Sequence, residues 1–336
     1  MAMMPAGTGG CPGMAPNDTA AEVAGTGAAG APLRIGVVPA SGLHDADVHE
    51  RARVMGRIAA AGLDGVLQAD HVSFRNGSGT DAIVMMAGLS GAHPSLGLHI
   101  GVYLLPLRHP VTVARSLATL AQLAPGRVVF GVGIGGEDRH EVEVCGVDPR
   151  TRGRRCDSSL TVLRALLAGE TVTHHDEFVS IDDCRIVPAP VPPIPVLVGG
   201  RSDAAVRRAG RFGDGWLGAW CSPRRFVEAM GICAEVAAAS GRGAVAWRHK
   251  YQPWVGLGAT TEEGRRHAAA AMERFYGLPF AAFERYTPCG TPADVAEALA
   301  PYVAAGVREF DLSLCAADTD EAIAMAGEVK RLLAAG

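Results

Sequence analysis

The sequence predicts an α/β fold, a (β/α)8 TIM barrel with an insertion segment between units four and five. After about residue 33, short apolar runs alternate with amphipathic helical stretches, and eight such units can be counted. Hydrophobic residues make up 48% of the 336 residues and aromatic residues only 5%, which suits a parallel sheet buried on both faces. An open doubly wound sheet is the alternative. No GxGxxG motif opens a helix after the first strand, as a dinucleotide-binding fold of that kind requires.

The order of the units gives a residue range for each element. Strands are expected at Leu33–Val38, Gly65–Ala69, Leu98–Leu104, Arg127–Val132, Ile194–Val198, Gly215–Leu217, Tyr251–Gly258 and Glu309–Leu314. Helices are expected near Ala46–Ala61, Asp81–Ala92, Pro110–Leu123, Arg154–Leu167, Asp203–Phe212, Pro223–Ala239, Thr261–Phe275, Pro292–Ala305 and Thr319–Leu333. Between Glu170 and Pro195 the pattern changes to a two-stranded excursion and a proline-rich lead-in, which form the insertion.

Residues 1–32 differ in composition from the rest of the chain. They are rich in Ala, Gly, Pro and Thr and contain few large apolar side chains. Burial of so little apolar surface does not offset the entropy of ordering a chain. We therefore expect a flexible tail over residues 1–32 and a single domain over residues 33–336.

Charge and composition point to a small-molecule substrate. A formal net charge of −4 without basic clusters argues against nucleic acid as a partner. No run of eighteen apolar residues occurs, so no membrane span is expected, and the first residues lack a signal-peptide pattern. The eight cysteines form no CxxC pair, which favours reduced thiols in the cytoplasm. No metal site is expected, because the one dense ligand group, His174-His175-Asp176, lies in the insertion.

The carboxyl ends of the strands are where a closed barrel carries its catalytic side chains. Asp70 and His71 directly follow the second strand. A histidine exchanges protons near neutral pH, and a neighbouring carboxylate raises its basicity. A capping Asp and a His packed over the sheet are the structural alternative, and these residues alone leave both open. Arg108 and His109, after the third strand, form a weaker candidate pair.

Two glycine-rich segments follow the fourth and fifth strands. Residues 131–136, GVGIGG, allow a planar ring or a phosphate to approach the backbone closely, and a flexible loop is the alternative. The segment Gly199-Gly200-Arg201-Ser202 leads into a helix. Free N–H groups at a helix start attract phosphate, and Arg201 and Ser202 add donors, so a phosphate site is the preferred interpretation.

Five segments occur in a fixed order along the chain: GLDGVLQADH, LPLRHPVTVARSLATLAQLAPGRVVFGVGIGG, GVDPRTRGRRCDSSLTVLRALL, PPIPVLVGGRSDAAVRRAGRFGDGW and GTPADVAEALAPYVAAGV. This ordered set resembles the bacterial-luciferase-like superfamily of flavin- and deazaflavin-dependent barrels. The resemblance implies a cofactor ring at the barrel mouth, with its phosphate held by the strand-five loop and neighbouring loops. The residues implied in cofactor binding are Gly101, Val102, Gly133, Gly135, Gly199, Gly200, Arg201 and Ser202. It also implies a non-proline cis peptide at Gly101-Val102, in a bulge behind the ring.

The resemblance also implies a reaction class. Asp70 and His71 match a family position that faces the ring in members that use coenzyme F420. The expected enzyme is therefore an F420-dependent oxidoreductase that transfers hydride to or from a small organic substrate, with His71 exchanging the proton and Asp70 orienting it. FMN is the alternative cofactor. It implies a monooxygenase that uses oxygen and reduced flavin from a partner reductase.

Three further expectations concern the substrate and the assembly. Deazaflavin sugar-phosphate dehydrogenases of the family carry an acid close after the strand-four glycines. This chain has Gly136 there, followed by Glu137, which argues against sugar-phosphate oxidation. Tyr103, Trp216 and Trp220 are expected to line an apolar substrate pocket, with rim packing as the alternative for the tryptophans. A homodimer is expected, because family members commonly pair through their barrel helices.

Overall fold

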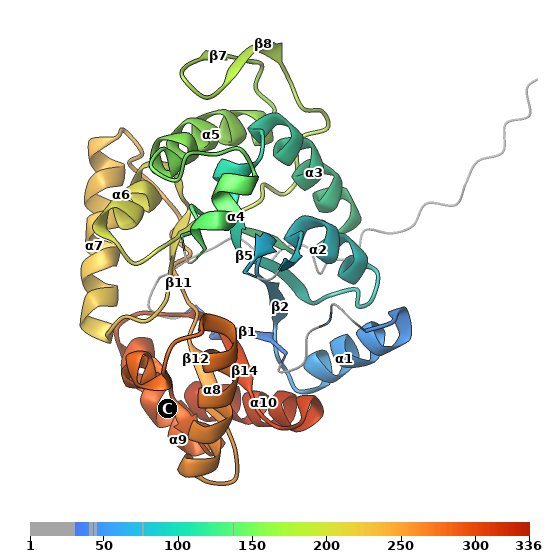
Figure 1. Cartoon of the computed structure of the whole chain (residues 1–336), viewed down its shortest axis with the longest axis vertical. Coiled ribbons are helices and arrows are strands. Elements are labelled where there is room, and N and C mark those ends of the chain that lie inside the picture. Colours follow the sequence, from blue (N-terminus) through green and yellow to red (C-terminus); the bar gives the residue numbers. More distant parts are fainter. Residues whose placement is uncertain (1–30, 40–42, 44–45, 76, 137) are drawn as a thin grey trace, which may run out of the picture.

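The computed structural model describes residues 31–336 except 40–42, 44, 45, 76 and 137. These residues form a closed barrel of parallel strands surrounded by helices (Figure 1). The predicted (β/α)8 barrel is therefore confirmed. The predicted tail lies outside the described residues except for residues 31 and 32, so the tail and the single domain over residues 33–336 stay predictions.

Eight strand positions make up the barrel. They are β1 (Arg34–Val38), β2 (Gly65–Gln68), β5 (Gly97–Leu104), β6 (Val128–Gly133), β9 (Val196–Gly199), β10 (Gly215–Gly218), β11 (Lys250–Tyr251) continued by β12 (Trp254–Leu257), and β14 (Glu309–Cys315). Neighbours are parallel, and β14 pairs with β1 to close the sheet. Both β11 and β12 pair with β14, so they share one barrel position that is interrupted at Gln252 and Pro253. The two-residue strand β13 (Cys289–Gly290) lies beside β12.

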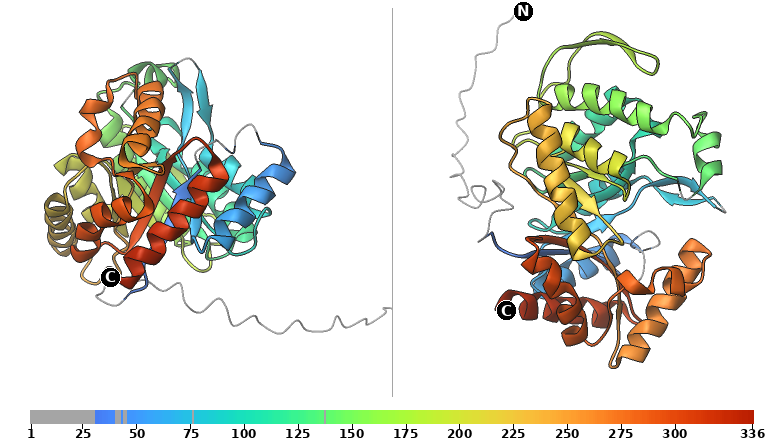
Figure 2. Two further views of the ribbon diagram at one scale, coloured as in Figure 1. Left: turned by 90° about the horizontal axis from the view of Figure 1, so that it is seen from below. Right: turned by 90° about the vertical axis from the view of Figure 1, so that its left-hand side faces the viewer.

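The helices form the outer layer. They are α1 (Val48–Ala60), α2 (Ala82–Ser90), α3 (Pro110–Leu123), α5 (Arg152–Leu167), α6 (Asp203–Phe212), α7 (Pro223–Ala239), α8 (Thr261–Tyr276), α9 (Pro292–Ala304) and α10 (Thr319–Ala335). The last helix, α10, packs beside the first, α1, which closes the outer layer as well (Figures 1 and 2). Across the described ranges, each helix is either too short or too polar to cross a membrane.

The predicted insertion is present as the antiparallel pair β7 (Val172–His175) and β8 (Ser180–Cys184), outside α5 (Figure 1).

The sequence did not predict two short elements near the carboxyl ends of the strands. A second hairpin, β3 (His71–Phe74) and β4 (Ser78–Thr80), follows β2, and the short helix α4 (Arg139–Val144) follows β6. Segments of three to six residues are too short to show a periodic pattern. Both of the missed elements lie in loops at the carboxyl ends of strands, where they build the site.

Charged side chains fill part of the barrel interior. The ammonium of Lys250 lies 3.0 Å from Asp311 and 2.9 Å from Nδ1 of His99, and Arg248 pairs with Glu309 at 2.7 Å. Burial alone would raise the pKa of Glu309, but Lys250 and Arg248 lower it to about 2. Two cations thus balance two carboxylates, so the interior is charged but locally neutral.

His249, which precedes β11, makes the stability of the fold depend on pH. Burial lowers the pKa of His249 from 6.5 to about 4, and its Nδ1 accepts a hydrogen bond from the backbone N–H of Trp216 at 3.1 Å. Because the pKa of His249 is lower in the folded state, folding favours its neutral form. The contribution of the neutral His249 to the stability of the fold is complete above about pH 6.5 and is lost as the pH falls toward 4. We expect His249 to account for about 2 kcal/mol of the stability lost between pH 7 and pH 5.

The measurement is urea denaturation at both pH values for the natural protein and for His249→Asn. The asparagine keeps an acceptor but does not titrate. The variant should therefore lose less free energy of unfolding than the natural protein between the two pH values. Equal losses in the two proteins would show that His249 does not contribute.

Candidate active site

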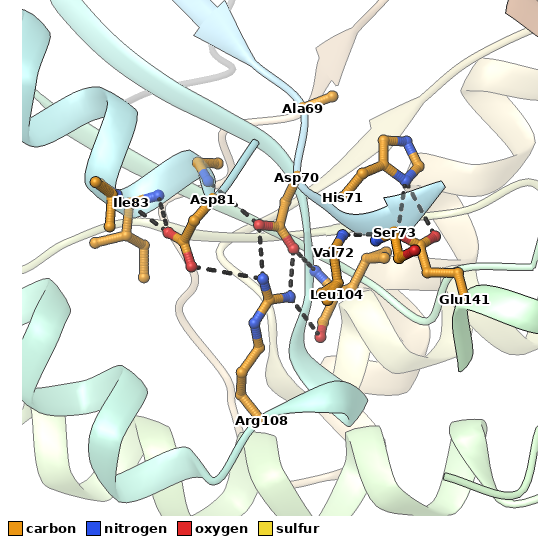
Figure 3. A network of polar contacts seen from close by, with 12 residues as sticks. Ala69, Asp70, His71, Val72, Ser73, Asp81, Ile83, Leu104, Arg108 and Glu141 are labelled. Carbon is orange, nitrogen blue, oxygen red and sulfur yellow. Dashed lines mark hydrogen bonds and ion pairs between the residues drawn. The ribbon is translucent and has the colours of Figure 1, made fainter. Parts of the chain in front are cut away.

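His71 lies at the start of β3, where the chain leaves the barrel, and its partner is Glu141 of α4 (Figure 3). Nδ1 of His71 lies 3.1 and 3.2 Å from the two carboxylate oxygens of Glu141. Among the described residues, Nε2 of His71 has no hydrogen-bond partner, and the side chain remains partly exposed. His71 therefore has one nitrogen bound to a carboxylate and one available to a ligand.

The carboxylate of Glu141 is itself held by the backbone. Its Oε1 accepts hydrogen bonds from the N–H groups of Val72 at 2.7 Å and Ser73 at 3.2 Å, and the residue is 2% exposed. Asp138, which caps α4, accepts from the N–H of Arg75 at 2.6 Å, and this hydrogen bond lowers the pKa of Asp138. Glu141 thus binds the backbone of β3, and Asp138 binds the residue that follows it, so the two carboxylates together fix the position of His71.

Asp70 does not orient His71, which corrects the sequence-based assignment. The two side chains point in different directions (Figure 3). Both Asp70 oxygens bind the guanidinium of Arg108, at 2.5 and 3.0 Å, and they also accept from the N–H groups of Leu104 and Ala82. Burial raises the pKa of Asp70, while Arg108 acts in the opposite direction. At 1% exposed, Asp70 joins the ends of β2 and β5 to the start of α2.

The predicted cis peptide between Gly101 and Val102 is present, and the pairing of β5 with β6 shifts there. The glycines around it have a packing role that the sequence did not indicate. A Cβ on Gly133 would lie 2.4 Å from the Val102 side chain, and one on Gly199 would lie 2.5 Å from it. A Cβ on Gly101 would lie 2.6 Å from Leu67. The absence of a side chain at these three positions therefore leaves room for Val102 and Leu67. This packing role does not depend on any contact with a cofactor.

The loop between β9 and α6, where the sequence predicts a phosphate site, combines a positive-φ glycine, a capping serine and an exposed arginine. Gly200 has φ +130°, a conformation that favours glycine. Ser202 caps α6, with its hydroxyl accepting from the N–H of Ala205 at 3.3 Å. Arg201 is exposed, and its guanidinium lies 5.1 Å from the Trp220 ring centre. Gly135, in the loop after β6, also has positive φ, at +68°.

The structure separates the three predicted pocket residues. Trp216 is 0% exposed, packs against Phe226, and donates its indole N–H to the carbonyl of Gly200 at 2.8 Å. Tyr103 is 4% exposed and packs between Phe130 and Arg108. Neither side chain lines a pocket, because both face the helices. Trp220 alone remains partly exposed at the mouth.

The other candidates from the sequence have structural roles or lie outside the description. His109 caps α3, and Glu137 is not among the described residues. His174 pairs with Asp176 and His175 with Asp182. Within the described ranges, no three His, Cys, Asp or Glu side chains are grouped as metal ligands. Burial raises the pKa of four cysteine thiols to about 12, so these are packing residues: Cys156, Cys221, Cys233 and Cys315.

Glu141 is the functional residue that the sequence analysis missed. It lies 70 positions from His71, on a helix of six residues. The available signal was local: Asp138 followed three residues later by Glu141 is a helix-start pattern. That pattern predicts a helix but does not indicate that the second carboxylate turns inward.

Residues 33–286 match the profile of the family described as luciferase-like monooxygenase. The match covers most of the barrel, including β2, β5, β6 and β9. The chain belongs to this family.

Curated relatives match over part of their length. The chain is 37% identical over 164 residues to an F420-dependent glucose-6-phosphate dehydrogenase of Beutenbergia cavernae, which covers 47% of this chain and 48% of the relative. It is 31% identical over 164 residues to limonene 1,2-monooxygenase of Rhodococcus erythropolis, which covers 47% of this chain and 42% of the relative. The chain thus spans about half the length of the curated relatives it matches.

Solved structures share the fold over most of the chain. An F420-dependent secondary alcohol dehydrogenase in complex with an F420-acetone adduct superposes with a TM-score of 0.79 at 20% identity, over 90% of this chain and 99% of that one. The oxygenating constituent of 3,6-diketocamphane monooxygenase from Pseudomonas putida, in complex with FMN, gives 0.70 at 16% identity, over 90% and 96%. The relatives and structures named above are described as dehydrogenases and monooxygenases.

The ion pair between Asp70 and Arg108 yields a prediction for stability. We expect Arg108→Ala to lower the free energy of unfolding by about 3–5 kcal/mol, because it leaves the Asp70 carboxylate buried without its cation. The double variant Asp70→Asn/Arg108→Gln should lose less free energy of unfolding, since neither residue is then charged. Urea denaturation measures both. A single variant as stable as the double variant would show that the pair does not hold the mouth together.

Proposed function

We propose that this chain is an F420-dependent oxidoreductase that transfers hydride between the deazaflavin and a small organic substrate. The proposal depends above all on the pairing of His71 with Glu141 at the barrel mouth, with Nε2 of His71 left for a substrate oxygen. Oxidation of an alcohol carbon releases a hydride and a hydroxyl proton, so it needs both a hydride acceptor and a base. Reduction of a carbonyl needs the same groups in reverse.

Glu141 selects the form of His71 that performs this task. A carboxylate on Nδ1 holds the Nδ1–H tautomer, which leaves Nε2 as the acceptor of a substrate proton. After the transfer, the same carboxylate stabilises the imidazolium that has formed. Because the backbone of Val72 and Ser73 holds Glu141, the histidine keeps its orientation without substrate.

The residues at the mouth fit the proposed cofactor. Arg201 and the start of α6 offer a cation and backbone donors for a phosphate, and Gly200 has the open backbone that close approach requires. Val102, held between Gly133 and Gly199, offers an apolar surface for a planar ring. When bound, coenzyme F420 supplies two-electron hydride chemistry. The chain supplies the ring surface, the anion site and the proton exchange at His71.

FMN is the second candidate cofactor. It is supported by the FMN complex of the Pseudomonas putida monooxygenase that shares the fold, and by the limonene monooxygenase relative. It would make the chain a monooxygenase that receives reduced flavin from a reductase. F420 is preferred, because the glucose-6-phosphate dehydrogenase relative is more similar in sequence and the alcohol dehydrogenase superposes more closely.

The first test is titration of the purified chain with oxidised F420 and with FMN in parallel, followed by quenching of tryptophan fluorescence. Saturable binding of F420, with weaker or no binding of FMN, is the expected result. Preferential binding of FMN would overturn the proposal in favour of the monooxygenase.

The role of the histidine predicts a loss of turnover without a loss of cofactor binding. We expect His71→Asn to lower kcat by about 10²–10⁴-fold, the usual contribution of general acid–base catalysis, with an unchanged Kd for F420. Glu141→Gln should lower kcat as well, because it removes the charge that stabilises the imidazolium. His140→Asn, an exposed histidine beside Glu141, is the matched control. Unchanged turnover in His71→Asn would remove His71 from the reaction.

The anion site predicts an effect on affinity alone. We expect Arg201→Gln to raise the Kd for F420 by roughly tenfold, since a charge-assisted hydrogen bond to phosphate contributes about 1.4 kcal/mol or more. Arg207→Gln replaces an exposed arginine within α6, outside the loop, and should leave the Kd unchanged. Equal affinity in both variants would place the phosphate elsewhere in the mouth.

A further inference from the structure

One row of aromatic side chains runs along the barrel mouth beside His71. We call this row the aromatic wall; it consists of Phe74, Trp220, Trp254, Phe275, Tyr276 and Phe283. Neighbouring rings of the wall have centres between 4.8 and 5.8 Å apart. The members come from β3, the β10–α7 loop, β12, the end of α8 and the segment that follows it. Figure 2 shows α8 and the β3–β4 hairpin projecting on the same side of the barrel.

The wall is unusual for this chain, which is poor in aromatic residues. The sequence has four Trp, five Tyr and nine Phe, so the six residues of the wall are a third of all its aromatic side chains. Four of the six are only partly buried: Trp220, Trp254, Phe275 and Tyr276. Trp216, by comparison, is 0% exposed, so the wall presents aromatic surface that the core tryptophan does not.

Both ends of the wall adjoin groups of the proposed reaction. At one end, the Phe74 ring centre lies 4.3 Å from that of His71, and Phe275 lies 6.3 Å from it. At the other end, Arg201 of the anion loop lies over Trp220. A substrate whose reacting carbon is near His71 therefore has its remaining atoms beside aromatic rings.

Cations that would hold an anionic substrate are scarce at the mouth. The chain has two lysines. Lys250 is buried against Asp311 in the barrel interior, and Lys330 binds Asp64. Arg75 binds the carbonyl of Tyr276 and packs over Phe74. Arg201 adjoins the wall at Trp220, and Arg152 lies beside Gly136 in the loop after β6. The proposed function already assigns Arg201 to the cofactor phosphate.

We propose that the substrate is an uncharged alcohol or ketone that carries an aromatic or alicyclic ring, and that the aromatic wall selects it. This inference rests on the proposed hydride transfer. In the oxidative direction, the alcohol carbon loses a hydride to the oxidised deazaflavin, its hydroxyl proton passes to Nε2 of His71, and the ketone forms. The ring makes apolar contacts with the wall, whereas a phosphorylated sugar places hydroxyl groups and a charged phosphate against it.

The test compares three substrates with the full chain and F420: cyclohexanol, propan-2-ol and glucose 6-phosphate, followed by the visible absorbance of the cofactor. Each additional buried methylene should raise kcat/KM by roughly fourfold, the equivalent of about 0.8 kcal/mol. Cyclohexanol should therefore exceed propan-2-ol by at least about tenfold, and glucose 6-phosphate should be the poorest of the three. A preference for glucose 6-phosphate would overturn the inference.

Single substitutions test whether the aromatic wall causes the preference for cyclohexanol over propan-2-ol. Phe275→Ala should lower kcat/KM for cyclohexanol by about tenfold or more, but that for propan-2-ol by less than twofold, with an unchanged Kd for F420. Leu278→Ala is the matched control, because this apolar residue lies just past α8, is 53% exposed and is not part of the wall. Equal losses for both alcohols in Phe275→Ala would remove the wall from specificity.

A binding measurement separates this inference from the proposed function. Two of the four tryptophans, Trp220 and Trp254, belong to the wall, so cyclohexanone should quench tryptophan fluorescence saturably without any cofactor, and less in Phe275→Ala. Glucose 6-phosphate should not quench tryptophan fluorescence under the same conditions. Ring binding without F420 binding would overturn the proposed cofactor and support the wall. F420 binding without ring binding or ring preference would overturn the wall alone.

Discussion

The buried ion pair of Asp70 and Arg108 is the interaction on which the geometry of the mouth depends. Asp70 receives the guanidinium and two backbone N–H groups, from Leu104 and Ala82. These partners belong to the end of β5, the loop after it, and the start of α2. A carboxylate buried without them would lose several kcal/mol of solvation, so the three segments stay together around it. His71 is the next residue along the chain, and its backbone position follows from that anchor.

A second set of carboxylates extends this arrangement to the next loop. Glu141 accepts N–H groups of β3, and Asp138 accepts the N–H of Arg75, which follows β3 in the hairpin. The same Glu141 that receives these hydrogen bonds also binds His71. Support for the hairpin and selection of the histidine tautomer are therefore one interaction, and a change in α4 affects both.

The glycine-rich strands also combine packing with chemistry. Val102 occupies the space that side chains at positions 133 and 199 would fill, so three neighbouring strands share one apolar surface at the mouth. The aromatic wall faces the mouth from β12 and α8, and Arg201 and Gly200 lie at its far end. The residues proposed for proton exchange, ring contact and anion binding thus come from units far apart in sequence. The closure of the barrel brings them to one rim, because parallel strands all end on the same side.

The sequence by itself determined the fold class, the eight units and the insertion, and the family resemblance indicated the place of the cis peptide. Alternating apolar runs and helix-start residues are local signals, and helices such as Pro110–Leu123 and Asp203–Phe212 begin and end where those signals predict. Only the tertiary structure decided which carboxylate meets His71, since Asp70 is adjacent to His71 in sequence, whereas Glu141 lies 70 positions away. The partner of Asp70, Arg108, lies 38 positions from it. It also decided that Trp216 and Tyr103 face the helices while Trp220 faces the mouth. The physical reason is that pairing and burial depend on where strand ends converge, and no local periodicity encodes that convergence.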